Sequence, residues 1–134
     1  DQTAITYPWT TVSDMSGETI KTILEDVCDN LFNPDPYYQQ GGDMVRTGGM
    51  TYTCNPAAKS GSRISDMRFG GQLMEAGKTY KVAGWAPVQE ASKNAGPPAW
   101  EVVETYLKDK KTIAPIKLYN PKLLGLDGNP GVVI

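Results

Sequence analysis

The clearest structural pattern in the sequence is a stripe of apolar residues that precedes the segment "NPDP". These residues recur at the spacing of one helical face: Ile20, Ile23, Leu24, Val27, Cys28 and Leu31. Ser16 can cap the start of such a helix, and Glu18 lies near the positive end of its dipole. Prolines at positions 34 and 36 cannot continue the hydrogen-bond ladder. The sequence therefore predicts one amphipathic helix between Ser16 and "NPDP".

Strand patterns lie on both sides of this helix. The segment Thr3 to Val12 is rich in Thr, Ile, Tyr, Trp and Val, which predicts a strand that Pro8 places at a sheet edge or bulge. Met50, Tyr52 and Cys54 alternate with threonines in a strand pattern, and Arg63 to Phe69 is predicted to be the next strand. "FGGQ" predicts a tight turn, because paired glycines supply positive φ freely. "AGKTYKVAGWA" predicts a further turn and strand.

A second helix is predicted to begin near "PPAW", where Pro98 suits the first helical turn. Its helical face would carry Val102, Val103, Tyr106 and Leu107. From Thr112 onward prolines recur without a helix or strand period, so we expect residues 112–134 to form an extended tail on the body. The predicted fold class is α+β, with a mixed β-sheet packed with about two main helices, in a single domain spanning residues 1–134.

Composition excludes several classes of function. The chain has 40% hydrophobic and 21% charged residues and a formal net charge of −2, which argues against a general nucleic-acid binder. Its apolar runs are shorter than the roughly 18 residues that a membrane span needs. The opening residues "DQTAITYPWT" have neither the basic region nor the apolar region of a signal peptide.

The chain has no histidine, which excludes several catalytic sites within it. Histidine-containing zinc sites, Cys-His nucleophiles and Ser-His-Asp triads cannot form, and no phosphate-binding GxxxxGK[ST] motif is present. Glu25 and Asp26 are adjacent carboxylates, but neighbours on a helix point to different sides, so we interpret them as a solvated helix face. The sequence allows a disulfide between Cys28 and Cys54. It favours free thiols, because both cysteines fall on apolar faces that bury a thiol comfortably.

The residues that remain suit recognition rather than catalysis. They are a cation in a glycine-bounded loop and aromatic residues near loops: Arg46, Tyr37, Tyr38, Trp85 and Trp100. Arginine suits an oxyanion, and aromatic residues at loop edges suit the wall of an amphipathic pocket. Each of these residues also has a purely structural interpretation. Arg46 could pair with Asp43, and Trp100 could be a core residue that packs the second helix.

Several long segments resemble one known family. They are "TILEDVCDNLFNPDPYYQQGGDMVRTGGMTYTCNP", "RISDMR", "LMEAGKTYKVAGWAPV" and "PKLLGLDGNPG". Together they are similar to the C-terminal domain of the SoxB thiosulfohydrolases of the bacterial Sox thiosulfate-oxidation system, in the 5'-nucleotidase superfamily. The resemblance extends from Ile5 to Gly131. It implies that the chain is an N-terminally truncated domain of the 5'-nucleotidase C-terminal type.

The resemblance also implies a function for the parent enzyme. Such an enzyme would release sulfate from a cysteine S-thiosulfonate on the SoxYZ carrier in the periplasm, with two manganese ions in a missing N-terminal metallophosphatase-like domain. We therefore expect this chain to hold no metal and to be inactive alone. The residues expected to contact substrate are Arg46, Gly41, Gly42, Asp43, Tyr37, Tyr38 and Trp100.

Within this set the resemblance gives different residues different roles. Arg46 would stabilise charge on the sulfonate oxygens. The glycines of the loop, including Gly48 and Gly49, would let the backbone approach a carrier arm closely. Trp100 lies roughly where nucleotidases place a base-stacking aromatic residue. The "GGDGF" motif typical of nucleotidases is absent, however, which weakens a nucleotide as substrate.

Two alternatives remain. One is the C-terminal domain of a 5'-nucleotidase or sugar-nucleotide hydrolase, which should show an aromatic clamp for a base. The other is a non-catalytic module that docks the carrier, which the lack of metal ligands in this chain would allow.

Overall fold

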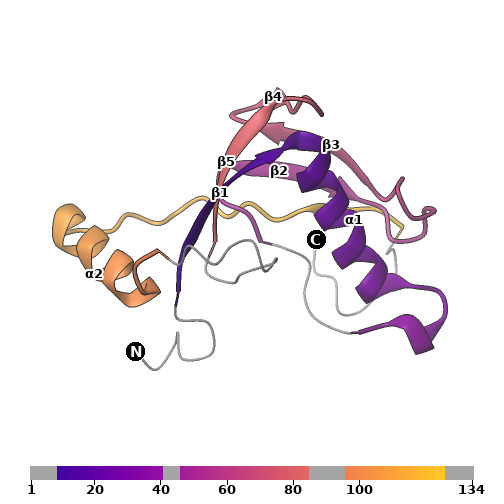
Figure 1. Cartoon of the computed structure of the whole chain (residues 1–134), viewed down its shortest axis with the longest axis horizontal. Helices are drawn as coiled ribbons and strands as arrows, with labels where there is room; N and C mark the ends of the chain where they lie inside the picture. Colours follow the sequence, from indigo (N-terminus) through magenta and orange to yellow (C-terminus); the bar gives the residue numbers. More distant parts are fainter. Residues whose placement is uncertain (1–8, 41–45, 85–95, 126–134) are drawn as a thin grey trace. The chain divides into compact units, whose positions relative to one another are not determined.

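The computed structural model describes residues 9–40, 46–84 and 96–125 (Figure 1). The chain divides into two compact units. Unit 1 consists of Asp1–Met15 and Thr79–Ile116, and unit 2 consists of Ser16–Lys78 and Lys117–Ile134. Each unit therefore joins segments that are far apart in the sequence.

Helix α1, Gly17–Phe32, belongs to unit 2 and follows the predicted pattern. The side chain of Ser16 accepts a hydrogen bond from the backbone N–H of Thr19 at 3.0 Å, so the predicted cap is confirmed. The helix ends at Asn33, directly before the first proline of "NPDP". A Cβ at Gly17 would lie 2.3 Å from the backbone oxygen of Glu75, so only glycine fits where α1 begins.

Unit 2 also contains a four-stranded mixed sheet, in the order β4-β3-β2-β6. Strand β2, Met50–Cys54, pairs antiparallel with β3, Ile64–Phe69, and parallel with β6, Lys122–Leu123. Strand β4, Gln72–Leu73, pairs antiparallel with β3. The turn between β3 and β4 uses two glycines with φ of +59° and +82°, as "FGGQ" predicts.

The hydrophobic core of unit 2 lies between α1 and the sheet (Figure 1). Its buried side chains come from α1 and from strands β2 and β3: Ile20, Leu24, Cys28, Tyr52, Cys54, Ile64 and Met67. Burying an aliphatic side chain such as Leu24 contributes about 2 kcal/mol to folding. The predicted helix stripe is therefore the face that packs on the sheet.

Unit 1 contains a two-stranded sheet of β1, Thr11–Ser16, and β5, Thr79–Gly84, together with helix α2, Ala99–Lys110. Thr10 joins the segment before α2, because its N–H and its hydroxyl both donate to the Pro97 carbonyl, at 3.1 and 2.6 Å. The boundary residue Ser16 is counted in unit 2.

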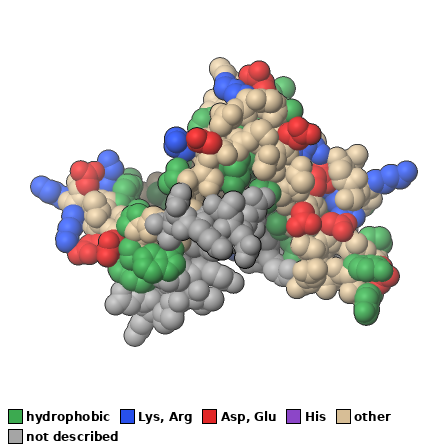
Figure 2. Space-filling model, viewed as in Figure 1, with side chains coloured by type: hydrophobic (Ala, Val, Ile, Leu, Met, Phe, Trp, Pro, Cys, Tyr) green, Lys and Arg blue, Asp and Glu red, His purple; other side chains and the backbone are tan. Residues whose placement is uncertain are grey.

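Helix α2 is confirmed, but none of its residues is buried. The apolar side chains predicted for one face are 42% to 55% exposed: Val102, Val103, Tyr106 and Leu107. Hydrophobic side chains are visible beside charged groups of both signs on α2 (Figure 2). Among the described residues, no helix is long and apolar enough to cross a membrane.

Two expected elements differ in detail from the structure. The strand predicted for Thr3 to Val12 falls mostly outside the described residues, and the described strand β1 extends to Ser16. In the tail, Lys122–Leu123 forms β6 beside β2, and Tyr119 bridges to Thr47. A strand of two residues is too short to show a strand period in the sequence. The single-domain organisation with a packed tail stays a prediction.

Candidate functional site

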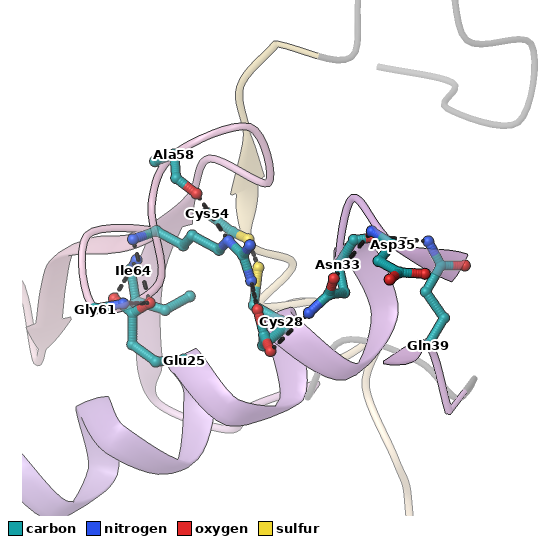
Figure 3. A network of polar contacts seen from close by, with 11 residues as sticks. Glu25, Cys28, Asn33, Asp35, Gln39, Cys54, Ala58, Gly61 and Ile64 are labelled. Atoms are coloured by element: carbon teal, nitrogen blue, oxygen red, sulfur yellow. Dashed lines mark hydrogen bonds and ion pairs between the residues drawn. The ribbon is translucent and has the colours of Figure 1, made fainter. Parts of the chain in front are cut away.

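The candidate site begins where α1 ends, in a short 3-10 turn, η1, Pro36–Tyr38. Asp35 caps this turn, because its side chain accepts a hydrogen bond from the N–H of Tyr37 at 2.9 Å. Asn33 accepts at its side-chain oxygen from the N–H of Asp35 at 3.0 Å. The side-chain amide of Gln39 donates to the Asn33 carbonyl at 2.7 Å (Figure 3). The "NPDP" segment thus does more than stop the helix, because it fixes the turn that follows.

Two adjacent tyrosines project from this turn. Tyr37 is 88% exposed and Tyr38 is 61% exposed. Their rings meet edge to face, with centroids 5.5 Å apart and an interplanar angle of 88°. This geometry is a favourable one for an aromatic pair. Large aromatic side chains held at the surface on a hydrogen-bonded turn can contact a partner without a large loss of conformational entropy.

Arg46 is exposed and lies just before β2. The next residue, Thr47, bridges to Tyr119, and its hydroxyl donates to the carbonyl of Met50 at 2.7 Å. The backbone beside Arg46 is therefore anchored to the sheet of unit 2. A cation on such an anchored segment can pair with an anion.

Some of the other predicted site residues lie outside the described residues. Gly41, Gly42 and Asp43 lie outside the described residues, as does Trp85, so pairing of Arg46 with Asp43 stays a prediction. A Cβ at Gly48 would meet no atom within 4 Å, so no contact in this structure requires glycine at position 48. Gly49 has φ of +81°, which favours glycine.

Trp100 belongs to unit 1, whereas both tyrosines and Arg46 belong to unit 2. It is the second residue of α2, and 36% of its surface is exposed. The alternative in which Trp100 is a buried core residue of α2 is wrong, because none of the residues of α2 is buried.

A buried carboxylate in unit 2 corrects another prediction. Glu25 is only 6% exposed, whereas the adjacent Asp26 is exposed. The prediction that both carboxylates lie on a solvated helix face is therefore correct for Asp26 and wrong for Glu25. The Glu25 carboxylate accepts from the backbone N–H groups of Gly61, Arg63 and Ile64 at 2.9, 3.2 and 2.8 Å. It also accepts from the ammonium group of Lys21 at 2.8 Å. Glu25 thereby holds the loop between β2 and β3 on α1 (Figure 3).

The surroundings of Glu25 favour its charged form. Burial by itself would raise the pKa of Glu25, but the hydrogen bonds from Lys21 and from the N–H groups of Ile64 and Arg63 outweigh it. The pKa of Glu25 is therefore lowered from its ordinary value. A carboxylate that stays ionised and is occupied by four donors serves as a structural anchor rather than as a general acid.

A second ion pair connects this loop to the tyrosine turn. The buried guanidinium of Arg63 donates to the Ala58 carbonyl at 2.9 Å and to the Asp29 carboxylate. The other oxygen of Asp29 accepts from the side-chain amide of Asn33 at 3.1 Å. Hydrogen bonds from Arg63 and Asn33 lower the pKa of Asp29. A continuous polar network thus runs from the β2–β3 loop to the residues that hold η1 (Figure 3).

The two cysteines of the chain meet in the core of unit 2. Cys28 of α1 and Cys54 of β2 are both fully buried, with their Sγ atoms 3.1 Å apart. Both are free thiols, as the sequence favours. Within the described part of the chain, no group of three or more His, Cys, Asp or Glu residues is arranged to hold a metal ion.

The family of the chain follows from comparison with known proteins. The model of the 5'-nucleotidase C-terminal domain matches residues 8–95. The chain belongs to this 5'-nucleotidase C-terminal domain family. A comparison with curated proteins found no match.

Solved structures support the same assignment. The sulfate thiohydrolase SoxB of Thermus thermophilus, in complex with glycerol, is 31% identical, with a TM-score of 0.73 over 90% of this chain. A putative 5'-nucleotidase of Staphylococcus aureus, in complex with alpha-ketoglutarate, is 16% identical, with a TM-score of 0.61 over 87% of this chain. This second match concerns the fold alone.

The family match and the SoxB match confirm that this is a C-terminal domain of the SoxB type, with the predicted α+β fold. The chain spans 23% of the SoxB chain and 27% of the putative 5'-nucleotidase chain. It therefore corresponds to part of those proteins.

Proposed function

We propose that this 5'-nucleotidase C-terminal domain supplies substrate contacts in a SoxB-type hydrolase. The parent enzyme would release sulfate from a cysteine S-thiosulfonate on the SoxYZ carrier, in the periplasm. The observation that carries the proposal is the likeness to SoxB, which extends over 90% of the chain at 31% identity. The likeness to a putative 5'-nucleotidase is lower, at 16%.

The described residues suggest how the domain would contact such a substrate. The exposed guanidinium of Arg46 would donate paired hydrogen bonds to sulfonate oxygens, a geometry that suits arginine. The exposed rings of Tyr37 and Tyr38 would contact the peptide arm that carries the cysteine. Trp100, which is partly exposed in unit 1, stays a proposed substrate contact.

The chemical step requires groups that the described residues do not provide. The chain has no histidine, and its described carboxylates and thiols form no metal site, so the described residues do not fit the two manganese ions. We assign those ions to a metallophosphatase-like domain elsewhere in the parent protein, and this domain to binding and orientation of substrate. The chain alone is expected to be inactive.

Turnover by the parent enzyme tests the proposal. The parent protein should release sulfate from thiosulfonated carrier and should turn over adenosine monophosphate poorly. Phosphate release from adenosine monophosphate without sulfate release would instead favour the nucleotidase alternative. Carrier binding by a parent protein that turns over neither compound would favour the docking module.

A further inference from the structure

The thiols of Cys28 and Cys54 are held in contact by regular secondary structure. Cys28 lies on the buried face of α1, and Cys54 is the last residue of β2. Cys54 pairs with Ile64 of β3 on one side and with Leu123 of β6 on the other. The two cysteines are 26 residues apart in the sequence, yet their Sγ atoms lie 3.1 Å apart.

Only a small movement separates this contact from a covalent bond. A disulfide has an S–S distance of about 2.05 Å, so the sulfurs would have to approach by about 1 Å. Rotation of the two side chains and a slight shift of α1 toward β2 are the movements that would close this gap. We propose that Cys28 and Cys54 are a redox-sensitive pair whose disulfide the native fold accommodates, and that this disulfide joins α1 to β2.

The reduced thiols of Cys28 and Cys54 should react slowly with oxidants while the domain is folded. Burial raises the pKa of Cys28, and it raises the pKa of Cys54 to about 12. Both thiols are therefore protonated at neutral pH, and the thiolate is the form that attacks a disulfide. Neither side chain is exposed to solvent. The bond should therefore form during folding or local opening, when an oxidant can reach the sulfurs.

The reaction balances with a disulfide compound as the oxidant. The thiolate of one cysteine attacks a sulfur of the oxidant, which forms a mixed disulfide and releases one thiol. The sulfur of the second cysteine then displaces the other half of the oxidant as a second thiol. The protein loses two electrons and two protons, and the oxidant gains both. Compartments with oxidising thiol-disulfide exchange supply such compounds.

The bond would close a loop that contains the candidate site. The segment between the two cysteines includes the turn η1 and Arg46. The disulfide would fix both ends of this segment to each other and restrict the unfolded chain. The inference rests on the contact between the sulfurs and does not depend on the proposed function.

Refolding under controlled redox conditions tests this proposal. The 134-residue chain is refolded from denaturant in glutathione disulfide and glutathione, or in dithiothreitol, and is then unfolded and treated with N-ethylmaleimide. After oxidising refolding it should take no label and weigh two hydrogens less, and its Tm should exceed that of the reduced chain by roughly 10 °C. After reducing refolding it should take a label on both cysteines.

Cys28→Ala is the matched control. This variant keeps one thiol, so oxidation should give no internal bond and no rise in Tm. The proposal is overturned if the wild-type chain refolds under oxidising conditions but, once unfolded, still takes both labels or carries glutathione on both cysteines. A bond that forms but lowers the Tm also overturns it, because such a bond would belong to a distorted fold.

Discussion

The carboxylate of Glu25 in α1 accepts a hydrogen bond of 2.8 Å from the backbone N–H of Ile64, the first residue of β3. This contact attaches the helix to the sheet through a buried charge. Glu25→Ala would leave the N–H groups of Gly61, Arg63 and Ile64 without their acceptor. Because unsatisfied buried donors are costly, we expect a loss of about 3 kcal/mol in unfolding free energy. Urea unfolding measures this loss.

Asp26→Ala is the control for that experiment. Asp26 is the exposed neighbour of Glu25, and its replacement should change stability by no more than about 0.5 kcal/mol. Equal effects of the two substitutions would contradict the role of Glu25 as an anchor.

Acid should destabilise the domain through the same carboxylate. The pKa of Glu25 is lowered in the folded state, so the unfolded state binds more protons as the pH falls. The stabilisation from Glu25 is complete above its unfolded pKa of about 4.3 and is lost as the pH falls through its lower folded pKa. Urea midpoints between pH 7 and pH 3 should therefore fall less steeply for Glu25→Gln than for wild type. Parallel pH profiles would count against this assignment.

The buried thiols should react slowly in the folded, reduced chain. At pH 8 the Cys54 thiol, with its pKa raised to about 12, is almost wholly protonated, and neither sulfur is exposed. Iodoacetamide should therefore label the folded chain at least about a hundredfold more slowly than the chain in denaturant. Mass spectrometry of timed samples gives both rates, and similar rates would show that the core of unit 2 is open.

Substitution of the exposed tyrosines should affect binding rather than stability. Tyr37→Ala and Tyr38→Ala each remove an exposed ring, so the Tm should change little. If the rings contact the carrier arm, KM for thiosulfonated carrier should rise several-fold at nearly constant kcat in the parent enzyme. Tyr106→Ala removes a similarly exposed ring from α2 and should leave KM unchanged. An equal rise in all three variants would argue against a specific contact.

Local signals predicted most of unit 2. The cap at Ser16, the apolar stripe and the two prolines determine the bounds of α1, because each acts on backbone groups nearby in the chain. The burial of Glu25 could not be predicted, since its acceptor oxygens are satisfied by residues 61–64, which follow β2. Residue type alone places a helical carboxylate in solvent.

The site was predicted less completely than the fold. Periodicity located both cysteines on apolar faces, but only tertiary packing brings their sulfurs together. The tyrosines were chosen for their type, whereas the hydrogen bonds of Asp35 and Asn33 that position them become visible in the structure. Strand β6 escaped prediction because two residues are too few to show a strand period.

Arg46 is the residue proposed to contact the sulfonate, and its substitution tests that contact. In the parent enzyme, Arg46→Ala should lower turnover of thiosulfonated carrier by about tenfold to a thousandfold, the loss expected from removal of one preorganised charge-stabilising donor. Arg46→Lys should recover little, because an ammonium group lacks the paired donors of a guanidinium. Arg68→Ala is the control, since the Arg68 side chain is partly exposed and its guanidinium pairs with Asp66 at 2.8 Å.

The decisive measurement is kcat/KM for sulfate release by these variants, beside their melting curves. We expect a large loss of kcat/KM for Arg46→Ala at an unchanged Tm, and wild-type kcat/KM for Arg68→Ala. Wild-type kcat/KM in a folded Arg46→Ala enzyme would contradict the central claim that this domain contacts the sulfonate through Arg46.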